Sequence, residues 1–221
     1  MSAAAPEPAA SLPAAELVVV RHGETTWNQE GRMQGHLDSP LNAAGVEQAE
    51  AVAARLATEA FAALYSSDLG RAFATARRIA ARSGHRVVAD PRLRERHLGV
   101  LQGLTRIDAS RDLPDVYEGY RNGGADYVIP SGESAAQCSA RVLAALEEIA
   151  RRHAGERAVV VAHGGVLDVL YRAALGLPHE GPRMFTILNA SVNLFRYAGG
   201  IWQLRVWGDV SHLGERALDD V

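Results

Sequence analysis

Residues 15–28 read AELVVVRHGETTWN, where three consecutive valines beginning at Val18 lead directly into Arg21 and His22. A short, β-branched apolar run without alternation is typical of a strand buried on both faces, as in a parallel sheet. The carboxyl end of such a strand is where open α/β sheets bind their ligands. Taken alone, His22 is better interpreted as a histidine that only terminates a strand, and a functional role depends on the rest of the chain.

A second stretch repeats this arrangement. Residues 157–176 read RAVVVAHGGVLDVLYRAALG, a β-branched run followed by His163, two glycines and an amphipathic segment. If the two strands are parallel neighbours, His22 and His163 meet at one rim of the sheet. The glycines after each histidine allow backbone N–H groups to approach a ligand, and the helix after Gly165 directs its positive end there. With Arg21, and with Arg71 after the YSSD strand, this rim is suited to a phosphate dianion.

The other segments predict a three-layer α/β/α sandwich with a mostly parallel sheet and an antiparallel edge. Strands are expected at residues 61–68 and 86–90, and helices after Asn42, from residue 69 to Gly84 and at residues 134–153. A hairpin is expected around Gly199 and Gly200. Residues 23–40 are too polar and glycine-rich for a helix, and residues 101–131 form an insertion over the sheet edge. We expect one domain at 15–221 after a disordered tail at 1–14.

Composition excludes several function classes. All 23 basic residues are arginine, so lysine Schiff-base chemistry and the lysine-dependent phosphate loop are excluded. The net charge of −3 and the dispersed arginines argue against a nucleic-acid partner, and no apolar run approaches the roughly 18 residues of a membrane span. The single cysteine, Cys138, suits the reducing cytoplasm and is expected to be buried. No cluster of histidines or carboxylates suggests a metal site.

Five motifs in a fixed order carry a family resemblance: RHGETTWN, GRMQGHLDSPL, SSDLGRAFATA, LRERHLGVLQGLT and VVAHGG. Together they resemble the histidine phosphatase superfamily, the phosphoglycerate mutase-like proteins, over residues 17–212. The resemblance implies that His22 attacks phosphorus and becomes phosphohistidine. It implies a phosphate pocket of Arg21, Arg71 and His163, and Glu95 as the proton donor to the leaving group. No cofactor or metal is implied, and the partner is a small phosphomonoester.

Further roles follow from the same resemblance. Asn28 and Gln34 match positions that contact the phosphoryl group or the substrate, and Gly35 and Gly164 are expected beside them. Glu24 is interpreted as a loop residue, His36 as a surface residue, and His97 as either packed or in contact with substrate. A homodimer stays open. Independently of the resemblance, the insertion directly follows the segment with Glu95, so its side chains are expected to reach over the leaving group: Arg106, Arg111, Tyr117, Tyr120 and Arg121.

Three functions compete at this point. The first is a phosphatase of a small phosphorylated metabolite, and GRMQGHLDSPL resembles the bacterial phosphatases of glucosyl-3-phosphoglycerate. The second is a cofactor-dependent phosphoglycerate mutase, favoured by ERHLGVLQGL, although the insertion lacks a paired-arginine element and the chain lacks lysine. The third is a non-catalytic phosphate sensor, which the intact set of His22, Arg21, Arg71, Glu95 and His163 argues against. The phosphatase is the preferred prediction.

Overall fold

The computed structural model describes residues 13–179, 181 and 183–216, so most of the expected N-terminal tail lies outside the described residues. Within them one sheet has the strand order β3-β2-β4-β1-β5-β6. The strands are β1 (Ala15–Arg21), β2 (Ala63–Ser66), β3 (Val87–Ala89), β4 (Arg157–Ala162), β5 (Val192–Ala198) and β6 (Ile201–Asp209). The first four are mutually parallel, whereas β5 and β6 form an antiparallel hairpin at one edge. This confirms the predicted mixed sheet.

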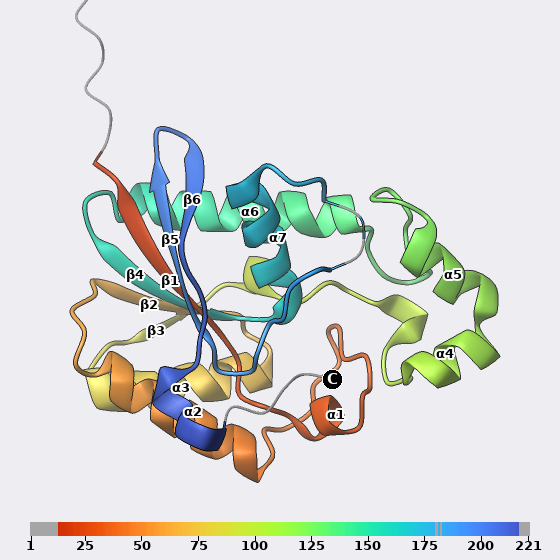
Figure 1. The fold of residues 1–221 in the computed structure, drawn as a ribbon, viewed down its shortest axis with the longest axis horizontal. Helices are drawn as coiled ribbons and strands as arrows, with labels where there is room; N and C mark the ends of the chain where they lie inside the picture. Colours follow the sequence, from red (N-terminus) through yellow and green to blue (C-terminus); the bar gives the residue numbers. More distant parts are fainter. Residues whose placement is uncertain (1–12, 180, 182, 217–221) are drawn as a thin grey trace, which may run out of the picture.

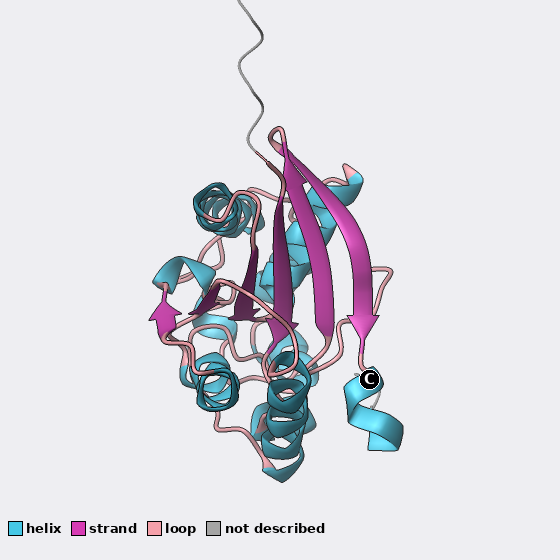
Figure 2. Cartoon of the chain, turned by 90° about the vertical axis from the view of Figure 1, so that its left-hand side faces the viewer, coloured by secondary structure: helices cyan, strands magenta, loops and turns pink. Residues whose placement is uncertain are grey.

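The valine runs lie in the central strands of the sheet, and helices cover both faces of the sheet (Figures 1 and 2). Leu17 and Val19 pack in one apolar cluster with α6 (Ala135–Arg152) and α7 (Gly164–Leu175). Val18 and Val20 pack in a second cluster with α2 (Ala43–Leu56) and α3 (Gly70–Ser83). Alternate side chains of β1 therefore enter opposite layers, as the pleat of a strand requires.

The helix ends follow the expected chemistry. Asn42 caps α2, since its Oδ1 accepts a hydrogen bond from the Gly45 N–H at 2.8 Å. Gly84 ends α3 in the left-handed region, with φ of 75°. Ser134 begins α6 with a capping box formed with Gln137. Local sequence thus determines where each of these helices begins or ends.

The structure corrects the expectation that residues 23–40 hold no helix, and it shows helices in the insertion that the sequence did not predict. Residues 23–40 contain a one-turn helix, α1 (Thr26–Gln29), which a capping box between Thr25 and Asn28 stabilises. Residues 101–131 contain α4 (Arg106–Asp112) and α5 (Pro114–Asn122). Elsewhere in the described residues, short 3₁₀ turns occur at Pro91–Leu93, Gly99–Leu101 and Ser211–Arg216. Figure 1 shows α4 and α5 beyond the carboxyl ends of the central strands rather than over an edge strand.

The α4–α5 insertion has a small core of its own. Leu98, Leu101, Ala109 and Ile129 are buried together, and tyrosines of the insertion pack around them. The loop between α1 and α2 is also tied to it, because Arg32 and Thr105 form an isolated antiparallel bridge. The insertion is therefore a small packed unit attached to that loop.

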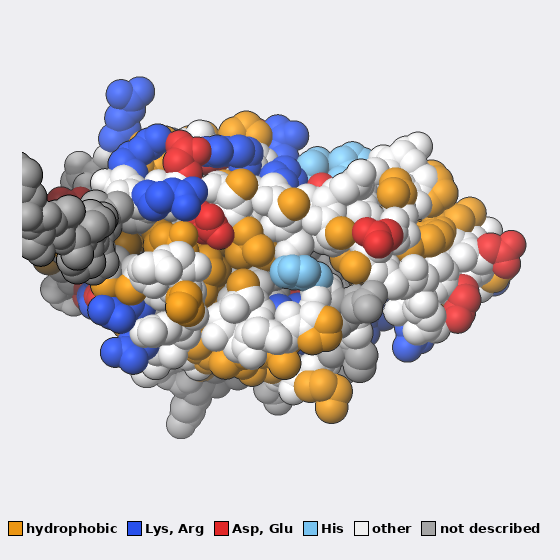
Figure 3. All heavy atoms as spheres, turned by 90° about the horizontal axis from the view of Figure 1, so that it is seen from above, with side chains coloured by type: hydrophobic (Ala, Val, Ile, Leu, Met, Phe, Trp, Pro, Cys, Tyr) orange, Lys and Arg blue, Asp and Glu red, His pale blue; other side chains and the backbone are white. Residues whose placement is uncertain are grey.

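No helix in the described part of the chain is long and apolar enough to cross a bilayer. On the face seen in Figure 3, basic side chains lie beside acidic ones rather than in a separate patch of one sign. On α6, for example, Arg151 pairs with Glu147 at 3.2 Å and Arg152 with Glu148 at 2.8 Å.

Candidate active site

His22 is the first residue after β1 and is buried at the end of the strand. Its Nδ1 lies 2.7 Å from the Gly23 carbonyl oxygen, and because a carbonyl can only accept, Nδ1 carries the proton. Burial holds the pKa of His22 well below its usual range, and the nearby cations Arg71 and Arg21 lower it further. His22 is therefore neutral, with its lone pair on Nε2, which is the form that can act as a nucleophile.

His163 occupies the equivalent place after β4, which pairs with β1 in parallel register up to Arg21 and Ala162. The two imidazole rings stand edge to face with their centroids 5.2 Å apart. Burial, followed by Arg71 and His22, lowers the pKa of His163 well below its usual range. Its Nε2 lies 2.8 Å from the Ser67 hydroxyl, and its buried Nδ1 has no hydrogen-bond partner among the described residues. A phosphoryl oxygen can satisfy that nitrogen.

Arg71 brings a buried cation to the same rim from the first turn of α3. Its guanidinium donates to the carbonyls of Gly35 at 2.7 Å and Leu37 at 3.0 Å, and pairs with Asp38 at 3.2 Å. Arg21 is buried too and donates to the Ile187 carbonyl. The two arginines thus put positive charge beside His22 while ordering the loops around it.

Glu95 reaches this rim from the loop after the first 3₁₀ turn. Its carboxylate accepts from the backbone N–H of Gly165 at 2.9 Å and from that of Arg96 at 2.8 Å. A Cβ at Gly164 would lie 3.8 Å from Arg21 Nε and 3.9 Å from Glu95 Oε2, and one at Gly165 would lie 2.0 Å from Glu95 Oε1. The carboxylate therefore sits against the N-terminus of α7, where only glycine leaves room for it.

The other predicted contact residues have mixed surroundings. Asn28 Oδ1 accepts from the Thr25 backbone N–H at 3.1 Å and its hydroxyl at 2.9 Å, so Asn28 has a structural task in α1. Gln34 is buried, and Gly35 has φ of 55° and offers its carbonyl to Arg71. Gly23 serves packing rather than ligand approach, because a Cβ there would lie 2.4 Å from the Gly45 carbonyl oxygen. Substrate contacts for Asn28, Gln34, Gly35 and Gly164 stay predictions.

Comparison with known proteins agrees with this geometry. Residues 17–210 match the model of the histidine phosphatase superfamily (branch 1). The chain belongs to this superfamily.

Its relatives include both of the enzyme types considered above. It is 50% identical to phosphoglycerate mutase-like protein 4 of Arabidopsis thaliana, over 91% of this chain and 88% of that one. It is 45% identical to a metal-independent phosphoserine phosphatase of the same plant, over 90% and 83%. The solved mycobacterial glucosyl-3-phosphoglycerate phosphatase in complex with VO₃ has a TM-score of 0.75 and 38% identity, covering 87% of this chain and 98% of that one. The predictions of a phosphoglycerate mutase-like fold and of a phosphomonoester hydrolase are confirmed.

His36, which sequence reasoning placed at the surface, lies beside Glu95. It is half-buried, its Nε2 lies 2.8 Å from the Glu95 carbonyl oxygen, and its ring centroid is 4.4 Å from that of His97. Burial lowers the pKa of His36. The sequence could not predict this contact of His36, because a hydrogen bond to a backbone carbonyl can be made with a residue of any type.

Within the insertion, the expected substrate-facing residues divide into two groups. Arg111 is exposed and bound to Asp112 at 2.7 Å and Asp108 at 3.1 Å, so its charge is already neutralised on the surface. By contrast, the Arg121 guanidinium lies over the Tyr117 ring at 6.0 Å, and the Tyr120 ring faces, at 5.4 Å, the guanidinium of Arg96, a residue that precedes the insertion and was not among those expected. Arg106 is exposed at the first position of α4.

Two further site expectations concern groups other than the catalytic set. Glu24 accepts a hydrogen bond from the Asn42 amide at 2.5 Å, which fits its interpretation as a loop residue. Cys138 is buried in α6, and burial raises the pKa of its thiol to about 12. Within the described residues, no group of three or more His, Cys, Asp or Glu side chains is placed to hold a metal ion.

Proposed function

We propose that this chain hydrolyses phosphomonoesters through a phosphohistidine formed on His22. The observation that carries the proposal is the contact of His22 Nδ1 with the Gly23 carbonyl oxygen, 2.7 Å away, because it keeps the proton on Nδ1 and leaves the lone pair on Nε2. Beside that nitrogen stand the buried cations Arg21 and Arg71 and the neutral His163. Such a site offers a nucleophile and an anion pocket in one place.

In the first step Nε2 of His22 attacks phosphorus, and the bond from phosphorus to the ester oxygen breaks. Arg21, Arg71 and His163 stabilise the negative charge on the non-bridging oxygens, which is the main requirement of phosphoryl transfer. Glu95 in its protonated form gives its proton to the departing oxygen. The products are an alcohol and His22 carrying the phosphoryl group.

In the second step a water molecule attacks the phosphorus of phosphohistidine. Glu95, now a carboxylate, takes a proton from that water, and the bond from phosphorus to His22 breaks. Inorganic phosphate leaves, while His22 and protonated Glu95 are restored. The same carboxyl group thus works first as acid and then as base, which its fixed place against Gly165 allows.

The substrate we propose is a small phosphorylated metabolite that carries an acid group. Two of the relatives support this class, since one is a phosphoserine phosphatase and the other a glucosyl-3-phosphoglycerate phosphatase. On the insertion side of the site, Arg96 follows Glu95 directly and lies over Tyr120. A guanidinium on the residue next to the acid suits a carboxylate of the leaving group. We place the enzyme in the cytoplasm, as its single buried cysteine suggests.

Chemical trapping tests the proposed intermediate. Brief incubation with phosphoserine carrying labelled phosphorus, followed by an alkaline quench and peptide mapping, is expected to give acid-labile label on His22. His22→Ala is expected to abolish both labelling and phosphate release, and Arg151→Ala on the surface of α6 is the matched control. Turnover by His22→Ala at the wild-type rate would contradict the proposal. A mutase would instead convert 3-phosphoglycerate to 2-phosphoglycerate faster than it releases phosphate.

A further inference from the structure

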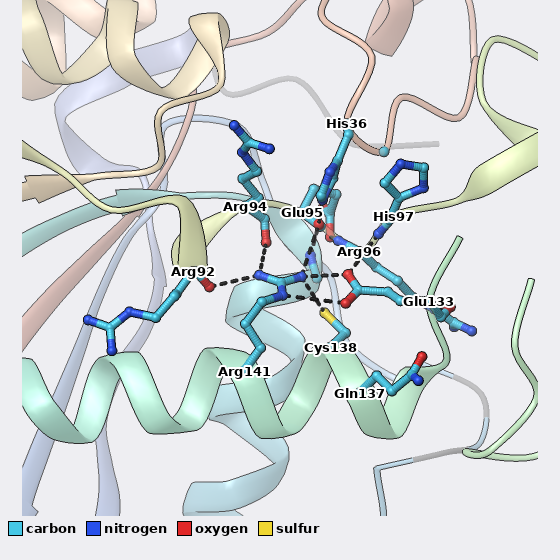
Figure 4. Close-up of polar contacts among 12 residues, drawn as sticks. His36, Arg92, Arg94, Glu95, Arg96, His97, Glu133, Gln137, Cys138 and Arg141 are labelled. Carbon is cyan, nitrogen blue, oxygen red and sulfur yellow. Dashed lines mark hydrogen bonds and ion pairs between the residues drawn. The ribbon is translucent and has the colours of Figure 1, made fainter. Parts of the chain in front are cut away.

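Arg141 of α6 lies outside the phosphate pocket but is bonded to the loop that bears Glu95. Its guanidinium donates to the backbone carbonyls of Arg92 at 2.7 Å, Arg94 at 3.0 Å and Glu95 at 3.3 Å, as Figure 4 shows. One side chain thus fixes three carbonyls within four consecutive residues. A planar guanidinium with five donors can do this, whereas a lysine ammonium cannot reproduce the pattern.

Glu133 completes this arrangement from the segment before α6. Its carboxylate accepts from Arg141 and from the backbone N–H of His97 at 2.8 Å. Its own N–H donates to the His97 carbonyl at 3.0 Å. The segment around Gly132 can approach the loop at His97 so closely only because residue 132 is glycine. A Cβ there would lie 2.5 Å from the His97 carbonyl oxygen. The loop is therefore held on both sides of Glu95.

The opposite side of the loop is held by His36, whose Nε2 donates to the Glu95 carbonyl. Glu95 thus has its carbonyl fixed by Arg141 and His36 and its carboxylate by Gly165 and Arg96. In the described part of the chain, no hydrogen bond of Arg141 reaches His22, Arg21, Arg71 or His163. Its contacts are with the loop that bears the proton donor, with Glu133 and with Cys138, and the phosphate pocket is held by other elements.

We propose that Arg141, together with Glu133, is a positioning residue for the proton donor Glu95. The inference rests on the proposed function, in which Glu95 protonates the leaving oxygen. A general acid works only within hydrogen-bond reach of that oxygen, and a displacement of about 1 Å can cost on the order of a hundredfold in rate. Arg141 sets the backbone from which the carboxylate extends, and Glu133 orients Arg141.

The test compares two esters of similar shape, phenyl phosphate and p-nitrophenyl phosphate. Only the first needs its leaving oxygen protonated. Arg141→Met is expected to lower kcat/KM for phenyl phosphate at least tenfold more than for p-nitrophenyl phosphate, and Arg141→Lys is expected not to restore it. Arg151→Met is the matched control, because Arg151 lies on the same helix with its side chain 52% exposed. It is expected to leave both rates unchanged.

A double variant separates positioning from general support of the fold. In the Glu95→Gln background, Arg141→Met is expected to produce no further loss of selectivity between the two esters, since the group that it positions is already disabled. Equal losses on both esters in folded Arg141→Met, or a further loss in the double variant, would overturn the positioning role. If Glu95→Gln itself lowers kcat/KM equally for both esters, it is the acid assignment that fails. Should Arg141→Met not fold, Glu133→Gln supplies the same comparison.

Discussion

His22 and His163 are adjacent across two strands, their rings 5.2 Å apart, and neither has the solvent exposure that a charged imidazole needs. Parallel pairing of β1 and β4 produces this relationship, because both residues directly follow paired strand ends. Two imidazolium ions at that separation, beside two arginines, would repel each other in a desolvated site. The strand register therefore enforces the neutral form of both rings, and catalysis by a histidine nucleophile depends on it.

Stability should fall with acid as a consequence. The pKa values of His22 and His163 are lowered in the folded state, so the unfolded chain binds more protons below its ordinary histidine pKa of about 6.5. The contribution of the two neutral histidines to the free energy of unfolding is complete above about pH 6.5. It is lost as the pH falls toward the pKa values that the histidines have in the folded state. Urea unfolding at pH 7.5 and 5.5 should show a loss of up to about 1.4 kcal/mol per histidine. The double variant His22→Asn, His163→Asn should flatten this dependence, and an unchanged slope would contradict the prediction.

Removing the acid should affect substrates unequally. Glu95→Gln keeps the size of the side chain but cannot protonate a leaving oxygen, and general acid catalysis contributes roughly 10²–10⁴-fold. The value of kcat/KM, which reports the formation of phosphohistidine and not its hydrolysis, should therefore fall about a hundredfold for phenyl phosphate and far less for p-nitrophenyl phosphate. Glu24→Gln, which changes a different carboxylate in the loop after His22, is the control. Equal losses of kcat/KM on both esters would remove Glu95 from the acid role.

Arg96, which precedes the insertion and lies over its Tyr120, should recognise acidic substrates, whereas Arg111 should not. Arg96→Met should raise KM for phosphoserine about tenfold or more, since a charge-assisted hydrogen bond contributes roughly 1.5–3 kcal/mol. Arg111→Met should change it little, because Asp108 and Asp112 already neutralise that guanidinium on the surface. Initial-rate measurements over a phosphoserine concentration series would decide. The prediction fails if both variants raise KM alike.

The phosphate pocket should work without a metal ion. Arg21 and Arg71 place two cations beside His22, which is the charge that a divalent ion would supply. Activity on p-nitrophenyl phosphate should persist in excess EDTA, and vanadate should inhibit it as a mimic of five-coordinate phosphorus. Loss of activity on chelation that a divalent ion restores would reverse this conclusion.

The sequence predicted the sheet and the meeting of the two histidines well, since β-branched runs and the glycines after them are local signals. It missed α4 and α5 because their small core combines Leu98, Leu101 and Ile129 from separate segments and leaves no period in the helices themselves. Arg141 and Glu133 also escaped notice. Their bonds go to backbone carbonyls and N–H groups, and such contacts require no matching side chain elsewhere in the sequence.

The crowding at Gly165 offers a way to divide the reaction by engineering. A single methyl at this position would collide with Glu95 Oε1, while the imidazoles and guanidiniums that receive the phosphoryl group lie elsewhere around the rim. Gly165→Ala would then still cleave esters with good leaving groups, such as p-nitrophenyl phosphate, but would bind ordinary alkyl esters without cleaving them. Such a variant would retain the natural substrate of this phosphatase long enough for the bound metabolite to be identified by mass spectrometry.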